Sequence, residues 1–155
     1  MKIMRKRKFS IIPVVVLIFI MIGCGEDDLP APLDPAATAQ ETSNTAQNGT
    51  WRVTYFFDTD TDETSNFTGY SFTFNGDGSV AAVNGSTTVT GTWTVTGGSS
   101  SSSDDDHFVV FFASPPDFAD LSDDWSIVSV STTKIELIDV SGGNGGTDYL
   151  TFEKN

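Results

Sequence analysis

An acidic run between residues 58 and 63 holds the most suggestive spacing of reactive side chains in this sequence. Asp58, Asp60 and Asp62 stand at alternate positions, and Glu63 follows directly. Calcium-binding loops wrap a hard cation with oxygen ligands at this alternate spacing. A complete loop also needs a glycine and a glutamate at positions where this chain has Glu63 and Gly69. Two interpretations therefore stay open: a calcium site and a solvated acidic hairpin.

Few side chains in the sequence are suited to catalysis. His107 is the only histidine and Cys24 the only cysteine. A Ser-His-Asp triad would have to use His107, and a zinc site with several histidines is impossible within one chain. A carboxylate pair for glycoside hydrolysis depends on a spatial separation that the sequence does not specify. We therefore predict a protein that is not an enzyme, with a hydrolase as the remote alternative.

Residues 1–23 resemble a bacterial lipoprotein signal peptide. The apolar run Ile11 to Ile22 is long enough for a signal-peptide core and too short to span a bilayer. The segment Met21-Ile22-Gly23-Cys24 resembles a lipobox, so we expect cleavage before Cys24 and its acylation. Two or three acyl chains would then anchor the protein stably in the membrane. The basic residues ahead of the apolar run are Lys2, Arg5, Lys6, Arg7 and Lys8.

The charge that remains after cleavage bears on the location of the protein and on the class of its binding partners. Glu26, Asp27 and Asp28 follow the lipidated cysteine, and this cluster resembles the surface-export signal of Bacteroidota lipoproteins. We expect an outer-membrane protein on the cell surface, with the periplasmic face as the alternative. Cleavage leaves three basic residues against 21 acidic ones, a net charge of −18. That charge repels nucleic acid, which we exclude as a partner.

The mature chain divides into a linker and one domain. Residues 24–48 contain no aromatic side chain and are rich in Pro, Ala, Thr and acidic residues, so we predict a disordered tether. Residues 49–155 hold all the tryptophans and tyrosines and have the size of a single small domain.

Alternating apolar and polar residues run through residues 49–155, which predicts strands and no helix. Asn75–Gly78 and Asn84-Gly85 are turn signals. The expected fold class is all-β, an antiparallel up-and-down barrel of eight strands, with a β-sandwich as the alternative. The expected strands are 50–57, 67–74, 79–83, 88–96, 107–113, 124–130, 133–140 and 148–153.

Several short motifs in this domain look like those of lipocalin-like lipoproteins of the Bacteroidota. Gly49-Thr50-Trp51 is similar to the Gly-x-Trp motif that opens lipocalins. The resemblance implies a barrel that carries a ligand at its open mouth. It also implies a basic partner for Trp51, and Lys154 is the only basic residue near the last expected strand. The other matching motifs are Gly91-Thr92-Trp93, Trp125 with Ile127, Ile135 with Leu137, and Leu150 with Phe152.

Strand counting places the connections 58–66, 84–87, 114–120 and 141–147 at the membrane-distal end. Tyr55, Phe57 and Tyr70 lie near that end and either line an apolar pocket or fill a solid core. We expect a surface-exposed binding protein for a small apolar molecule or a protein partner. The alternative is a calcium-dependent adhesion or carbohydrate-binding sandwich, with Asp58, Asp60, Asp62 and Glu63 as the calcium ligands. No other cofactor is expected.

Overall fold

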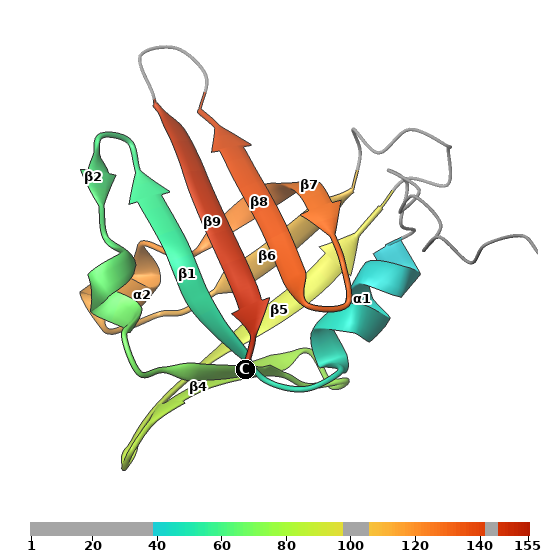
Figure 1. Cartoon of the computed structure of the whole chain (residues 1–155), viewed down its shortest axis with the longest axis horizontal. Helices are drawn as coiled ribbons and strands as arrows, with labels where there is room; N and C mark the ends of the chain where they lie inside the picture. The colour runs from blue at the N-terminus through green and yellow to red at the C-terminus, as the bar shows by residue number, and fades with distance from the viewer. Residues whose placement is uncertain (1–38, 98–105, 142–145) are drawn as a thin grey trace, which may run out of the picture.

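The computed structural model describes residues 39–97, 106–141 and 146–155. Its strands follow one another along the chain (Figure 1). The elements are α1 (Ala39–Gln47), β1 (Trp51–Asp58), β2 (Thr61–Asp62), η1 (Thr64–Phe67), β3 (Ser71–Phe74), β4 (Ser79–Asn84), β5 (Thr87–Thr96), β6 (His107–Phe111), α2 (Pro116–Ala119), β7 (Asp123–Val130), β8 (Lys134–Val140) and β9 (Thr147–Lys154).

The sheet closes on itself. From β3 to β9 each strand pairs antiparallel with the next, β3 also pairs with β1, and β9 pairs with β1 along most of its length. The result is the predicted antiparallel up-and-down barrel of eight strands, with the two-residue β2 as an extra strand. The β-sandwich alternative is wrong, because the pairing of β1 with β9 leaves one continuous sheet instead of two.

The seam between β1 and β3 is the thinnest join in the barrel, since it rests on the single register pair Trp51 and Phe72. Beyond that pair, β2 and η1 cover the edge of β1. The Phe56 amide donates to Thr64 Oγ1 at 2.8 Å, and the Glu63 amide donates to the Phe56 carbonyl at 2.9 Å. These bonds satisfy backbone groups that an open edge would expose.

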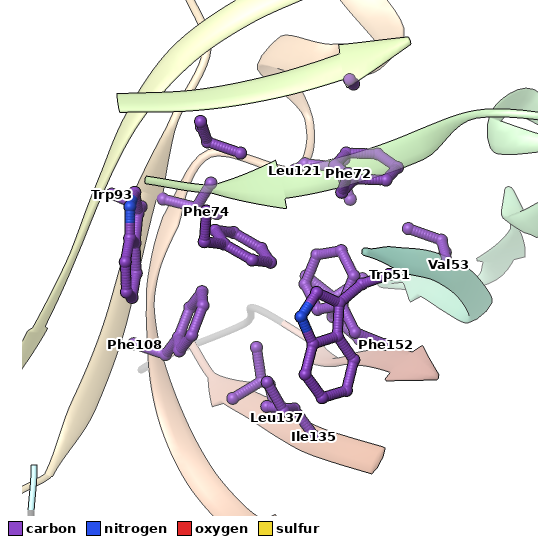
Figure 2. Close-up of a cluster of buried hydrophobic side chains, with 14 of the residues drawn as sticks. Trp51, Val53, Phe72, Phe74, Trp93, Phe108, Leu121, Ile135, Leu137 and Phe152 are labelled. Atoms are coloured by element: carbon purple, nitrogen blue, oxygen red, sulfur yellow. The ribbon is translucent and has the colours of Figure 1, made fainter. Parts of the chain in front are cut away.

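Aromatic side chains fill the barrel interior. Figure 2 shows the rings of Phe74, Phe108 and Phe152 facing one another between the strands. The centroid of the Phe74 ring is 5.3 Å from that of Phe108 and 5.5 Å from that of Phe152, and both contacts are edge-to-face. Aromatic pairs prefer this geometry, because the positive edge of one ring meets the negative face of the other.

Each of the three tryptophans ties a connecting segment to the barrel. Every indole N–H donates a hydrogen bond to a backbone carbonyl outside the barrel strands. The bond satisfies a buried donor without using a carbonyl that pairs the strands. The three bonds run from Trp51 to Ala46 at 2.8 Å, from Trp93 to Asn75 at 3.0 Å and from Trp125 to Leu121 at 3.1 Å.

Helix α1 corrects the predicted domain boundary. We expected disorder through Asn48 and no helix, but Ala39–Gln47 is helical, with Thr42 and Ala46 fully buried. The helix forms because its small buried residues pack at one end of the barrel, where the Ala46 carbonyl accepts the Trp51 indole N–H. Figure 1 shows α1 and α2 on opposite sides of the barrel.

The expected signal peptide, Cys24 and the rest of the tether lie outside the described residues, which begin at Ala39. Within the described ranges, no helix is long and apolar enough to cross a membrane. The predicted turns are confirmed: Gly78 and Gly85 both adopt a positive φ, of 83° and 57°. Such backbone conformations favour glycine over any residue with a Cβ.

Candidate binding surface

A β-bulge in β1 decides which aromatic side chains reach the surface. Val53 pairs with Phe152 of β9, but the next paired residue of β1 is Tyr55, so Thr54 is an extra residue in the ladder. An extra residue reverses the alternation of inward and outward side chains. Phe56 is therefore fully buried, whereas Tyr55 is 40% exposed.

The predicted site residues Tyr55 and Phe57 thus lie on the outer face of the barrel, which corrects the expectation that they line an interior pocket or fill the core. After Val53 the sequence allows either Phe56 or Phe57 to point into the barrel, because both side chains are aromatic. Burying Phe56 lets its ring meet Phe67 edge-on at 5.6 Å, and the bulge leaves Tyr55 on the outer face.

On the outer face, Tyr55 and Phe57 join Tyr149 of β9. The Tyr55 ring centroid is 6.3 Å from those of both Phe57 and Tyr149, and Phe57 is the cross-strand partner of Tyr149. Tyr149 is 40% exposed, and Ile138 of β8 is its partner on the other side. We call Tyr55, Phe57 and Tyr149 the outer aromatic patch.

Tyr70, the third predicted ligand-binding residue, is not part of this patch. It stands between η1 and β3, is half-buried, and packs edge-on against Phe118 of α2 at 5.0 Å. The sequence grouping of Tyr70 with Tyr55 and Phe57 is therefore not seen in the structure, which places Tyr149 beside them instead. A signal for Tyr149 was present, because closure of an up-and-down barrel always places the last strand beside the first.

The acidic run folds as a tight hairpin. Phe57 pairs with Asp62 and Asp58 with Thr61, which leaves Thr59 and Asp60 as the turn. Within the described residues, no group of three or more His, Cys, Asp or Glu side chains is placed to hold a metal ion. The predicted ligands Asp58, Asp60, Asp62 and Glu63 are thus not brought together, and calcium binding stays a prediction of the sequence.

The carboxylates of this hairpin take part in local hydrogen bonds. Asp58 Oδ1 accepts from the Thr59 hydroxyl at 3.1 Å. Asp62 Oδ1 accepts from the Thr64 amide at 3.0 Å. Hydrogen bonds from the side chain and the amide of Thr64 lower the pKa of Asp62, because they favour the ionised carboxylate. Asp62 therefore carries a full negative charge beside Phe57 at neutral pH.

The two ends of the barrel differ in their basic side chains. We define the far end of the barrel as the end that carries the connections after β1, β4, β6 and β8. The near end is the opposite one, with α1 and the C-terminus. The three basic side chains in the described ranges all lie toward the near end. Arg52 Nη2 is 3.1 Å from Glu153 Oε2, Lys134 pairs with Glu136, and Lys154 Nζ lies 5.7 Å from the Trp51 ring centroid.

Carboxylates crowd the far end with no basic residue among them in the described chain. Partial burial raises the pKa of Glu63, and repulsion from Asp120, Asp58 and Asp117 raises it further. Burial likewise raises the pKa of Asp123, to which the charges of Asp139 and Asp148 add. These shifts show that the carboxylates repel one another. A cation arriving there would relieve that repulsion.

The far end of the barrel is closed by its own side chains. Phe67 of η1, Phe118 of α2 and Leu121 are almost fully buried at this end. The Phe118 ring lies 5.3 Å from the Phe67 centroid and 5.1 Å from that of Phe112. Of the two interpretations left open by the sequence, a solid core and a pocket, this packing favours the solid core.

His107, the sole histidine, lies on the outer face of β6. Its Nδ1 atom is 3.1 Å from Asp124 Oδ1 without a hydrogen bond between them, so the two form an ion pair only when the ring is protonated. Ser126 is its cross-strand partner, yet no hydroxyl in the described ranges hydrogen-bonds to the ring. The described residues thus assemble no serine–histidine–aspartate relay at His107.

Comparisons with known proteins do not assign the chain to a family. No protein-family model matches the sequence, and no curated protein matches it. Among solved structures, the chain is similar to a DUF4847 family protein from Bacteroides vulgatus. The two share 14% sequence identity over 73% of this chain and 96% of that chain, with a TM-score of 0.45. At this level the similarity does not extend to function.

Proposed function

We propose that this protein is a lipid-anchored, surface-exposed binding protein that docks a partner protein on the outer surface of its lipocalin-like barrel. The observation that carries the proposal is the outer aromatic patch, with Tyr55 and Tyr149 both 40% exposed. Exposed tyrosine is enriched in protein interfaces, because its ring supplies a large contact area at low entropic cost. The protein needs no catalytic residues for this role.

The outer surface is favoured over the barrel interior because the interior is occupied. Rings from β3, β5, β6, β9, η1 and α2 pack against one another from end to end of the barrel. A small apolar ligand would have to displace Phe67 or Phe118, each at most 2% exposed. Burial of a phenylalanine is worth roughly 1.5–3 kcal/mol, so such a displacement is unfavourable.

The lipocalin-like part of the proposal is supported at the start of the first strand. The resemblance implies a tryptophan there with a basic partner, and Lys154 Nζ lies 5.7 Å from the Trp51 ring centroid. Trp51 and Lys154 are also cross-strand partners in the register of β1 and β9. A Cβ added at Gly49 would come within 2.7 Å of Lys154 Cε, so the glycine of Gly-x-Trp makes room for the lysine side chain.

Anchoring and exposure are tested on whole cells that produce the protein. We expect labelled palmitate to be incorporated into the parent chain and not into a Cys24→Ser variant. We also expect protease added to intact cells to remove the barrel. Label retained by the Cys24→Ser variant would contradict anchoring at this residue, and protection from protease would place the barrel on the periplasmic side.

The docking surface is tested by photo-crosslinking in the same cells. A photoreactive phenylalanine at position 57 or 149 should give a discrete adduct with another protein. The same residue at position 111, where Phe111 is 55% exposed on β6, serves as the matched control. Equal adducts from all three positions, or none from the patch, would contradict the proposal. A lipophile retained by the purified protein in native mass spectrometry would instead indicate carriage inside the barrel.

A further inference from the structure

We infer that the outer aromatic patch, together with the unneutralised carboxylates of the far end, docks a cationic segment of the partner protein through arginine or lysine side chains. This inference rests on the proposed function and adds the chemical class of the partner. Three features of the structure support it: the arrangement of the rings, the carboxylate beside them and the charge of the surrounding surface.

The rings form a surface on which a cation can stack. The planes of Tyr55 and Phe57 are inclined by only 18°, with centroids 6.3 Å apart. The Tyr149 ring is tilted by 39° to Tyr55 at the same separation. A guanidinium or ammonium group within about 6 Å of such a ring centroid is attracted to the negative ring face, and arginine adds planar stacking.

A charged carboxylate borders this surface. Asp62 of β2 is the cross-strand partner of Phe57, and directly opposite residues of an antiparallel pair have Cβ atoms about 5 Å apart on the same face. Thr64 holds the carboxylate through the hydrogen bond from its amide. Asp62, Phe57, Tyr149 and Ile138 therefore form one row across four strands, with a charge at one side and apolar side chains beside it.

The surrounding charge selects a basic partner. Arg52, Lys134 and Lys154, the basic side chains of the described ranges, are engaged toward the near end and do not neutralise the far end. A second copy of this chain would bring the same negative surface, and like charges across an interface are unfavourable. Anionic lipid head groups and nucleic acid are repelled for the same reason.

The test uses the purified full chain in detergent micelles with three fluorescent probes: a short peptide of alternating arginine and glycine, its glutamate counterpart, and a neutral glucose oligosaccharide. Fluorescence anisotropy at about 0.15 M salt gives Kd values under moderate screening. We expect the arginine peptide to bind and the other two probes not to bind. Tyr149→Ala should raise Kd about tenfold, which is about 1.4 kcal/mol and lies within the range of partly desolvated cation–π contacts.

Matched variants separate a built site from a general attraction to negative charge. Phe111→Ala removes a ring from β6 that is even more exposed than Tyr149, and should leave Kd unchanged. Asp62→Asn keeps an acceptor for Thr64 but removes the charge, and should raise Kd about fivefold. Glu41→Gln removes one charge from α1 at the near end and should change Kd less than twofold. If Tyr149→Ala fails to fold, Tyr149→Thr, a residue suited to the strand, replaces it.

Two outcomes would overturn the inference. Equal Kd values for the parent and Tyr149→Ala would mean that the peptide senses only the net charge. Binding of the oligosaccharide that depends on Tyr149 would assign the patch to glycans instead. The proposed function fails separately: if adducts form at positions 57 and 149 in cells while peptide binding ignores Tyr149 and Asp62, docking stands and the cationic partner is rejected.

Discussion

Truncation of Phe118 to alanine is expected to open the far end of the barrel. Phe118 projects from the single-turn helix α2 and is 2% exposed. Its ring has four aromatic neighbours at centroid distances from 5.0 to 6.0 Å. These neighbours are Tyr70, Phe112, Phe67 and Phe72. The substitution removes all four contacts at once and leaves an apolar void between η1, α2 and β3.

The loss of stability follows from those contacts. Replacing a buried phenylalanine with alanine costs about 3–5 kcal/mol, with the larger values where the surroundings cannot collapse. That range already includes the loss of aromatic pairs, three of which are edge-to-face here and worth about 0.5–1.5 kcal/mol each. We therefore expect about 4 kcal/mol, the middle of the range. At about 4–8 °C per kcal/mol for a domain of this size, the melting temperature should fall by roughly 20 °C or more.

Urea denaturation followed by tryptophan fluorescence measures this loss, because Trp51, Trp93 and Trp125 are all buried reporters. Phe111→Ala is the matched control: its ring is 55% exposed, so its loss should be within about 0.5 kcal/mol. A second readout is benzene binding by NMR. Apolar cavities made by truncation stay dry and take up benzene, so the variant should bind it and the parent should not.

A loss below about 1 kcal/mol would refute the packing described for this end, since it would approach the roughly 0.5 kcal/mol effect of a surface substitution. Benzene binding by the parent would refute it as well, because it would show a cavity that Phe118 does not fill. Either result would return the barrel interior to consideration as a ligand site.

Three further predictions concern helix α1 at the near end, Gly91 in β5, and Asp123 at the far end. A chain that begins at Gly49 should be about 1–3 kcal/mol less stable to urea than one that begins at Ala39, because the Trp51 indole loses its acceptor. Gly91→Ala should cost about 1–3 kcal/mol in the same assay, since its Cβ would overlap the Phe111 carbonyl oxygen. The folded-state pKa of Asp123 is raised, so ionisation weakens folding as pH rises above the ordinary value of 3.8. Asp123→Asn should therefore melt higher than the parent at neutral pH, with a gain that vanishes below that value.

The sequence alone determined the number and order of the eight barrel strands and the approximate bounds of most of them. It did not predict β2, and the predicted strand 67–74 is a strand only over Ser71–Phe74, because η1 ends at Phe67. Alternation and turn residues are local signals, and both were sufficient here: the predicted strand 88–96 is β5, Thr87–Thr96, and the Asn75–Gly78 turn joins β3 to β4. An uninterrupted series of short antiparallel connections then leaves a closed barrel as the natural way to remove the open edges.

Tertiary packing decided the rest. Phe56 and Phe57 compete for the interior with equal local propensity, and only the space beside Phe67 and Trp125 selects Phe56 through a bulge. Helix α1 carries no bulky apolar stripe, so its sequence resembles that of a linker. Its contact with the barrel, where the Ala46 carbonyl accepts the Trp51 indole N–H, depends on tertiary packing.

The candidate surface is likewise a product of closure. Phe57 and Tyr149 are far apart in the chain, and they become neighbours only because β9 pairs with β1. The acidic residues of the far end are also scattered along the sequence, and strand order collects them away from Arg52, Lys134 and Lys154. Sequence pattern thus specifies which residues face outward on each regular strand. Long-range pairing decides which of them share a surface, because that depends on contacts between distant segments.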